Sequence, residues 1–136
     1  MNKIILLCGF LFLSFFSMAQ PNYKVVFDLT SKDSNDQKAV IRWLNEVSKA
    51  EPTAKMEVVM YGQGLDLVTK GKSAVSDDVV QLAANKNIAF KVCRVAMKAH
   101  NLTENDLLQG VQTVPDGIYE VISKQREGWG YIKVKN

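Results

Sequence analysis

Residues 88–100 read IAFKVCRVAMKAH, and their pattern changes from strand to helix at a single residue. The apolar run at 88–92 is typical of a strand buried in a sheet. Residues 94–100 favour a helix, so Cys93 stands where the strand ends and the helix begins. A strand that leads directly into a helix is the repeating unit of α/β proteins, which makes this class the first expectation for the chain.

The same alternation recurs along the whole chain. Strands are predicted at 23–29, 56–61, 88–92, 111–114 and 129–134, and helical segments at about 36–50, at 65–69, from 76, from 93, at 103–109 and from 115. Continuously apolar strand centres, such as Val25-Val26-Phe27, indicate strands that are covered on both faces. We therefore predict one α/β domain of three layers around a mainly parallel five-stranded sheet.

Local signals give finer expectations for the helices. Ser76 is predicted to cap the helix that follows it, and Pro115 is expected in the first turn of the last helix, where no N–H is needed. Gly128 is predicted to end that last helix. The inward side of the last helix is expected to carry its aliphatic residues, Ile118, Val121 and Ile122.

Functional groups in parallel sheets gather outside the carboxyl ends of the strands. Three predicted loops fall at that edge: residues 30–35, residues 62–64 and the turn that holds Cys93. The topology alone therefore favours a shared crevice formed by these three segments.

The first 19 residues have the layout of a secretory signal peptide. Lys3 is followed by a nearly unbroken apolar run at 4–16 and then by Ser17-Met18-Ala19, which suits cleavage before Gln20. The run is shorter than the roughly 20 residues of a membrane-spanning helix, so no stable anchor is expected after cleavage. The predicted product is a domain at residues 20–136, exported to a compartment that is most simply the periplasm. Its mild charge, +3 for the whole chain, argues against nucleic acid or an anionic membrane as partner.

The chain contains two cysteines, and Cys8 lies inside the predicted leader. Cys93 would then be the only thiol of the mature protein and could not form a disulfide within it. Helix N-termini stabilise negative charge, and Lys91 and Arg94 are close in sequence, so Cys93 is a candidate for sulfur or redox chemistry. The alternative is an inert buried side chain, because free cysteine is among the most buried residue types.

Two further residues are candidates for a role beside Cys93. His100 is the only histidine. A helix joining it to Cys93 would separate the two by about 10 Å, so we expect no direct Cys–His pair within one subunit and an exposed imidazole instead. Asp28, at the end of the first strand, could face the crevice or cap the polar loop after it, and the second is the favoured expectation. Trp129 and Tyr131 are expected to pack against the sheet or a neighbouring subunit.

Other motifs lack the spacing that their chemistry needs. Gly71-Lys72-Ser73 has Asp66 where a phosphate-binding loop requires glycine, and Gly62-x-Gly64 lacks the third glycine of a dinucleotide fingerprint. The chain has no C-x-x-C, and its one histidine and one mature cysteine do not suggest a metal centre. We therefore expect neither a metal nor a cofactor.

The order of elements and the position of Cys93 resemble the DsrE/DsrF-like family. The resemblance covers residues 23–136 and is strongest in VCRVA, residues 92–96, and in the C-terminal runs VPDGI, 114–118, and QREGWGYI, 125–132, which are similar to a single-cysteine branch. Sulfur-relay members usually carry an Arg-Gly pair after the cysteine helix, whereas this chain has Ala99-His100-Asn101.

The resemblance implies a small α/β domain that assembles into trimers or hexamers. In the sulfur-relay members the corresponding cysteine accepts a persulfide and passes it to a thiol of a partner protein, a role that would fall on Cys93. Two hypotheses follow. The protein is either a sulfur-transfer protein that acts through Cys93, or a non-catalytic oligomeric binding module of the cell envelope in which Cys93 is only buried.

Overall fold

The computed structural model of the protein describes residues 22–135; the predicted signal peptide and its cleavage site lie outside this range. Five parallel strands form one sheet within it, in the order β4-β3-β2-β1-β5. The strands are β1 (Lys24–Leu29), β2 (Lys55–Met60), β3 (Ile88–Cys93), β4 (Gln112–Val114) and β5 (Gly130–Lys133). The predicted α/β class and five strands are confirmed, and the sheet is wholly parallel.

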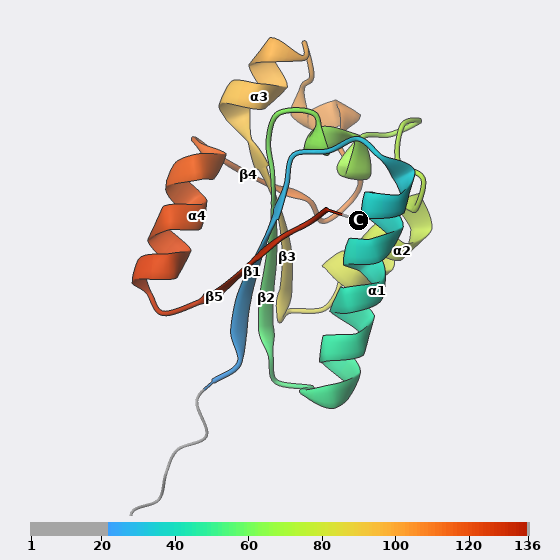
Figure 1. Cartoon of the computed structure of the whole chain (residues 1–136). Coiled ribbons are helices and arrows are strands. Elements are labelled where there is room, and N and C mark those ends of the chain that lie inside the picture. The colour runs from blue at the N-terminus through green and yellow to red at the C-terminus, as the bar shows by residue number, and fades with distance from the viewer. Residues whose placement is uncertain (1–21, 136) are drawn as a thin grey trace, which may run out of the picture.

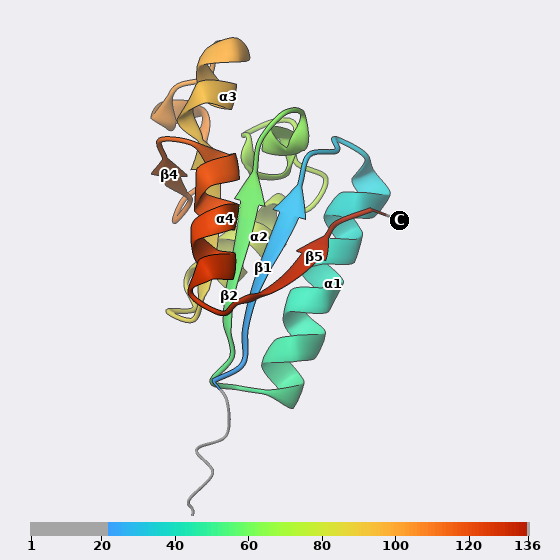
Figure 2. The ribbon, with the colours of Figure 1, turned by 60° about the vertical axis from the view of Figure 1, so that its left-hand side comes forward.

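Helices cover both faces of the sheet and complete the three layers (Figure 1). α1 (Ser34–Ala50) and α2 (Ser76–Ala83) lie on one face, and α4 (Gly117–Arg126) lies on the other. The chain advances from β1 to β4 in one direction. Figure 2 shows it leaving α4 and crossing β1 to enter β5 at the opposite edge.

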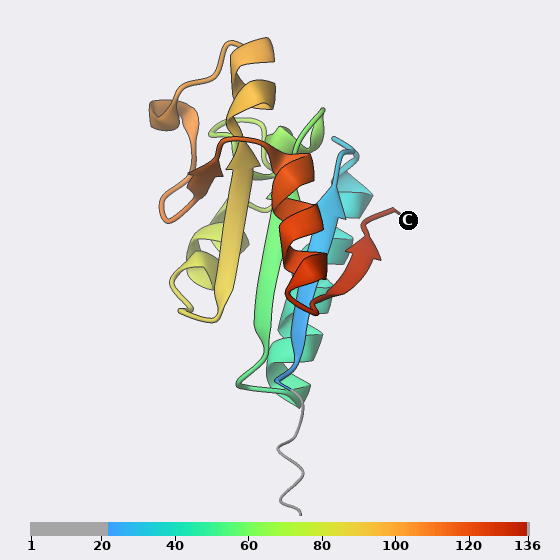
Figure 3. The ribbon, with the colours of Figure 1, turned by 90° about the vertical axis from the view of Figure 1, so that its left-hand side faces the viewer.

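A fourth helix, α3 (Arg94–Ala99), continues from β3 beyond the carboxyl ends of the strands (Figure 3). Two short 3₁₀ helices, η1 (Gly64–Val68) and η2 (Glu104–Asp106), lie in the connections before α2 and β4. Among residues 22–135, no helix combines the length and the hydropathy needed to cross a membrane.

The main hydrophobic core lies between the sheet and the α1/α2 layer. Alternate strand residues point to this side because side chains in a strand alternate between its two faces. Trp43 of α1 stacks on Phe27 with ring centroids 6.3 Å apart. The strand residues buried on this side are Val25, Phe27, Leu29, Met56, Val58, Met60, Ile88, Phe90 and Val92.

The opposite face, under α4, is different in character. Its apolar cluster is small and consists of Val26, Val59 and Val121, with Tyr61 and Trp129 packed against it. Glu57 and Lys91 also point to this side, and Glu120 and Lys124 of α4 turn inward to meet them.

This charged cluster corrects the predicted inward face of α4. Val121 is buried as expected, but Ile118 and Ile122 are exposed. The inward stripe of the helix is Gly117, Val121 and Lys124, because the carboxylate of Glu57 on the sheet favours an inward lysine. The hydrophobic pattern of α4 therefore indicated the wrong side of the helix.

Two predicted helix starts are also corrected. α2 begins at Ser76 itself, and Val75 occupies the capping position without a side-chain hydrogen bond. α4 begins at Gly117 and is capped by Asp116, so Pro115 precedes the cap and does not form the first turn. Gly128 follows the last helical turn with φ +84°, as predicted for a glycine that ends a helix.

Candidate functional site

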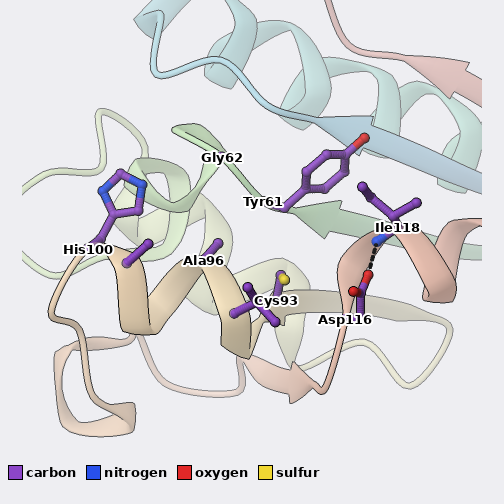
Figure 4. A pocket seen from close by; sticks show the side chains of 9 residues that line it. Tyr61, Gly62, Cys93, Ala96, His100, Asp116 and Ile118 are labelled. Carbon is purple, nitrogen blue, oxygen red and sulfur yellow. Dashed lines mark hydrogen bonds between the residues drawn. The ribbon is translucent and has the colours of Figure 1, made fainter.

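A cavity of about 270 Å³ lies at the carboxyl ends of β2 and β3, between α3 and the start of α4 (Figure 4). Cys93 belongs to its lining, which is formed by three segments of the chain, residues 61–62, 93–100 and 116–118. The other lining residues are Tyr61, Gly62, Val95, Ala96, Ala99, His100, Asp116 and Ile118.

Cys93 is the last residue of β3 and the capping residue of α3, as the sequence predicted. Its side chain is 5% exposed and lies at the cavity wall. The neighbouring Gly117 leaves room for it. A Cβ added at Gly117 would lie 3.1 Å from Cys93 Cβ and 3.2 Å from Tyr61 Cδ1. The thiol is therefore buried from bulk water but adjoins an open cavity.

The two cationic side chains close to Cys93 in sequence, Arg94 and Lys91, are paired with other groups. Arg94 Nε donates to Thr113 Oγ1 at 3.0 Å, and its guanidinium pairs with Glu104 at 3.3 Å. Lys91 Nζ lies 3.8 Å from carboxylate oxygens of both Glu57 and Glu120. α3 has six residues, fewer than two turns of aligned peptide dipoles. Of the positive charge expected around Cys93, only the partial charge at the start of the short helix α3 remains.

Asp116 brings a carboxylate into the cavity lining. Its Oδ1 accepts hydrogen bonds from the backbone N–H groups of Ile118 at 2.8 Å and Tyr119 at 3.0 Å. These are the first free amides of α4, so the carboxylate occupies the helix start that an anionic ligand would otherwise use.

His100 lines the same cavity from the other end of α3 (Figure 4). It caps the C-terminus of the helix and is exposed, as predicted. Because the complete helix separates it from Cys93, the backbones of the two residues are about 10 Å apart along the axis. The two residues lie at opposite ends of one cavity and do not form a catalytic pair.

The cavity is lined by a different set of segments from the crevice that the sequence predicted. Gly62 and Cys93 contribute to the cavity as expected, but the 30–35 loop contributes Lys32 to a separate hollow, with Gln63, Asp66, Lys72 and His100. The segment Asp116–Ile118 takes its place. Sequence reasoning missed this segment, although a signal was present: the turn after the fourth parallel strand must reach the same sheet edge as the others.

Asp28 forms a polar cluster beneath this edge. It is buried, and its Oδ2 accepts hydrogen bonds from the hydroxyls of Tyr131 at 2.6 Å and Tyr61 at 3.1 Å. Lys133 Nζ donates to Asp28 Oδ1 at 3.2 Å and to Thr30 Oγ1 at 2.8 Å. The expectation that Asp28 caps the following loop is wrong, because Tyr61, which directly follows β2, and the β5 residues Tyr131 and Lys133 supply its donors.

The same cluster changes the acidity of both tyrosines. The hydrogen bond to Asp28 is the main reason that the pKa of Tyr131 rises to about 12. Burial, followed by the charge of Asp28, raises the pKa of Tyr61 to about 12. Both hydroxyls are therefore protonated donors at neutral pH, and Tyr61 presents its ring to the cavity while its hydroxyl is bound to Asp28.

A second buried cluster lies under α4. Burial, assisted by a hydrogen bond with Glu120, raises the pKa of Glu57 to about 7. Lys91 and Lys124 oppose this shift, and Lys124 also lies 5.0 Å from the ring centroid of Trp129. Glu57 Oε1 is buried without a hydrogen-bond partner among the described residues. This cluster holds α4 against the sheet and does not line the cavity.

Metal ligation has no basis in the part of the chain that the structure describes. No three His, Cys, Asp or Glu side chains within residues 22–135 converge on a point that could hold an ion.

A parallel α/β domain with one free cysteine among its described residues, at the carboxyl end of the third strand, defines the class of this protein. The sequence matches the DsrE/DsrF-like family over residues 24–134, and the chain belongs to that family. No functionally curated protein matches the sequence.

Solved structures support the same assignment of fold. Protein MTH1491 of unknown function, from Methanobacterium thermoautotrophicum, is 29% identical with a TM-score of 0.76, over 82% of this chain and 98% of its own. The ychN protein from E. coli is 12% identical with a TM-score of 0.68, over 82% and 98%. The conserved protein BT1422 of unknown function, from Bacteroides thetaiotaomicron, is also 12% identical with a TM-score of 0.68, over 83% and 96%. The last two likenesses show the fold alone.

Proposed function

We propose that this protein transfers sulfur, with Cys93 accepting a sulfane sulfur as a persulfide and passing it to another thiol. The observation that carries the proposal is the position of the thiol. Cys93 lies at the functional edge of a DsrE/DsrF-like domain and lines a cavity large enough for a small sulfur donor.

The reaction needs no electron donor or acceptor. The Cys93 thiolate attacks the outer sulfur of a hydropersulfide, R–S–S–H. A new S–S bond forms, the donor S–S bond breaks, and R–S⁻ leaves with the bonding electrons and takes up a proton. Cys93 then carries –S–S–H. A partner thiolate attacks the outer sulfur in the same way, and the Cys93 thiolate is released.

The surroundings of Cys93 suit the storage of such a group. The described residues contain no second cysteine that could attack the persulfide and close a disulfide. Burial at 5% exposure also limits access by bulk thiols and oxidants. Release would then require a partner that can enter the cavity.

Mass spectrometry of the native protein after polysulfide treatment tests this function. A Cys8→Ser background leaves Cys93 as the single thiol. We expect a gain of about 32 Da, one sulfur atom, that Cys93→Ser abolishes. If the unfolded protein gains sulfur and the native protein does not, the native thiol is inaccessible and the proposal is wrong.

The alternative, a non-catalytic oligomeric binding module, is favoured by another observation. Three exposed apolar side chains lie on α4: Ile118, Tyr119 and Ile122. Such a surface suits contact with further copies of the chain. This function predicts slow alkylation of native Cys93 and no effect of Cys93→Ser on partner capture.

Assembly and location complete the proposal. A trimer or hexamer would cover the apolar α4 surface, and light scattering of the purified protein would measure it. Export to the periplasm predicts a mature chain that begins at Gln20, which N-terminal sequencing of the protein from its native host would show.

A further inference from the structure

The cavity beside Cys93 is open to solvent and lined mainly by apolar side chains. Ala96 and Ala99 of α3 and the ring of Tyr61 form its walls. Val95 and Ile118 line it and are 63% and 56% exposed, so they lie at its rim, where a ligand enters. A ligand that reaches the thiol must therefore exchange water for apolar contacts, which favours an apolar group.

The charges around the cavity give no attraction to an anion near the thiol. Asp116, the only carboxylate that the described residues supply to the lining, already accepts two amides from the first turn of α4. Arg94 and Lys91 are paired with carboxylates of other residues. His100 lines the cavity from the other end of α3, about 10 Å from Cys93 along the helix axis.

We infer that the cavity selects sulfur donors with uncharged, apolar tails and discriminates against donors whose tails carry a carboxylate. This inference rests on the proposed sulfur-transfer function and names its substrate class. The net reaction is Cys93–SH plus R–S–S–H giving Cys93–S–S–H plus R–SH, in which R is the tail that occupies the cavity. An anionic tail would lose its hydration beside Asp116 without gaining a partner, and that cost appears as a slower transfer.

Three hydropersulfides of similar length test the inference on the full chain in the Cys8→Ser background. Their tails are butyl, which is uncharged, propionate, which is anionic, and aminoethyl, which is cationic. The rate of sulfur addition to native Cys93 is measured by mass spectrometry, and each rate is divided by that of the same donor with the unfolded chain. This ratio removes the intrinsic reactivity of the donor. We expect the normalised rate to favour butyl over propionate by about tenfold, which corresponds to roughly 1.4 kcal/mol.

Ile118→Lys supplies a variant that should change the selectivity. It places a cation at the cavity rim on a side chain that is already exposed, so folding is expected to be unaffected. The preference for butyl over propionate should fall by a factor of about three or more, because the new ammonium attracts the carboxylate. Ile122→Lys is the matched control: it adds the same charge one turn along α4 on another exposed residue that does not line the cavity. The preference of this control variant for butyl over propionate should stay close to that of the parent chain.

The outcomes separate the inference from the function beneath it. If no donor adds sulfur to the native chain while all three modify the unfolded one, the sulfur-transfer function itself fails. If all three add sulfur and propionate reacts as fast as butyl, transfer stands and the apolar selectivity is wrong. Equal responses of Ile118→Lys and Ile122→Lys would also overturn the inference, because the effect would then come from overall charge and not from the cavity.

Discussion

Glu57 is a carboxylate on the central strand β2, buried where the α4 layer meets the sheet. Its neighbours are two lysines at 3.8 Å, distances that provide ion pairing without short hydrogen bonds. Burial disfavours the charged carboxylate more than the two lysines stabilise it, so the pKa of Glu57 rises to about 7. The native protein therefore holds a proton in a pH range where the unfolded chain has already lost it.

This proton predicts a pH dependence of stability. Between the ordinary carboxyl pKa, 4.5, and about 7, the native state binds more protons than the unfolded state, so Glu57 lowers the free energy of unfolding as pH rises. Glu57→Gln cannot titrate, so its stability relative to the parent should increase from pH 5 to pH 8 by roughly 1 to 2 kcal/mol. Urea unfolding at the two pH values measures the change.

Glu46→Gln is the control for this experiment. Glu46 is exposed on α1 and pairs only with Arg42, at 3.7 Å, among the ion pairs of the described residues. Its relative stability should vary little over the same range. A parent protein whose stability does not decline relative to Glu57→Gln would show that Glu57 titrates normally.

At the scale of the elements, the edge strand β5 is short and has no buried residue of its own. Its backbone pairs with β1, and its side chains Tyr131 and Lys133 reach the buried carboxylate of Asp28. A carboxylate with several donors is a strong anchor because each hydrogen bond involves a charge. The position of β5 therefore depends on polar contacts as well as on its ladder.

Removing one of these donors should weaken the anchor. Tyr131→Phe deletes the 2.6 Å hydrogen bond to buried Asp28 and should cost about 1 to 3 kcal/mol of unfolding free energy. The folded pKa of Tyr131, about 12, exceeds its ordinary value of 10, so its contribution is lost as pH rises from 10 to 12. Denaturant unfolding at neutral and alkaline pH should show the variant losing less stability than the parent over that interval. Tyr119→Phe, on the exposed side of α4, should match the parent; a Tyr131→Phe effect no larger than this control would contradict the anchor.

At the scale of the molecule, the two faces of the sheet differ in composition. The α1/α2 side contains nearly all of the large buried side chains, whereas the α4 side combines three buried valines with charged clusters and the wall of the Cys93 cavity. Apolar burial is therefore concentrated on one face, and the Cys93 cavity lies on the other. The two tryptophans report on these faces separately, since Trp43 packs on the first and Trp129 on the second.

The two faces should nevertheless unfold together. Both share the same five strands, and a domain of this size normally unfolds in one cooperative step. Trp43→Phe and Trp129→Phe each leave one fluorescent reporter. In each variant, the fluorescence midpoint in urea should coincide with the midpoint of that same variant by circular dichroism. A lower fluorescence midpoint for the Trp129 reporter alone would show that the α4 layer detaches first.

The sequence predicted those features that depend on local periodicity. It located five strands, the strand-to-helix junction at Cys93 and the exposed, distant His100, because each follows from residues close together in the chain. It misplaced Ile118 and Ile122, since the inward side of α4 depends on Glu57, about 60 residues away in the chain. Asp28 was misread for the same reason: its donors Tyr61 and Tyr131 come from segments far from it in the chain.

What the sequence determined by itself is the α/β class and the cysteine at the end of the third strand, since hydrophobic periodicity and turn residues act over short spans. The family followed from the match of the sequence to the DsrE/DsrF-like family. Only the tertiary structure decided which groups surround that cysteine. It brought Gly117 against the thiol, directed Lys91 and Arg94 to other carboxylates and left an apolar cavity in their place. The physical reason is that burial and pairing of charges depend on contacts between segments far apart in the chain.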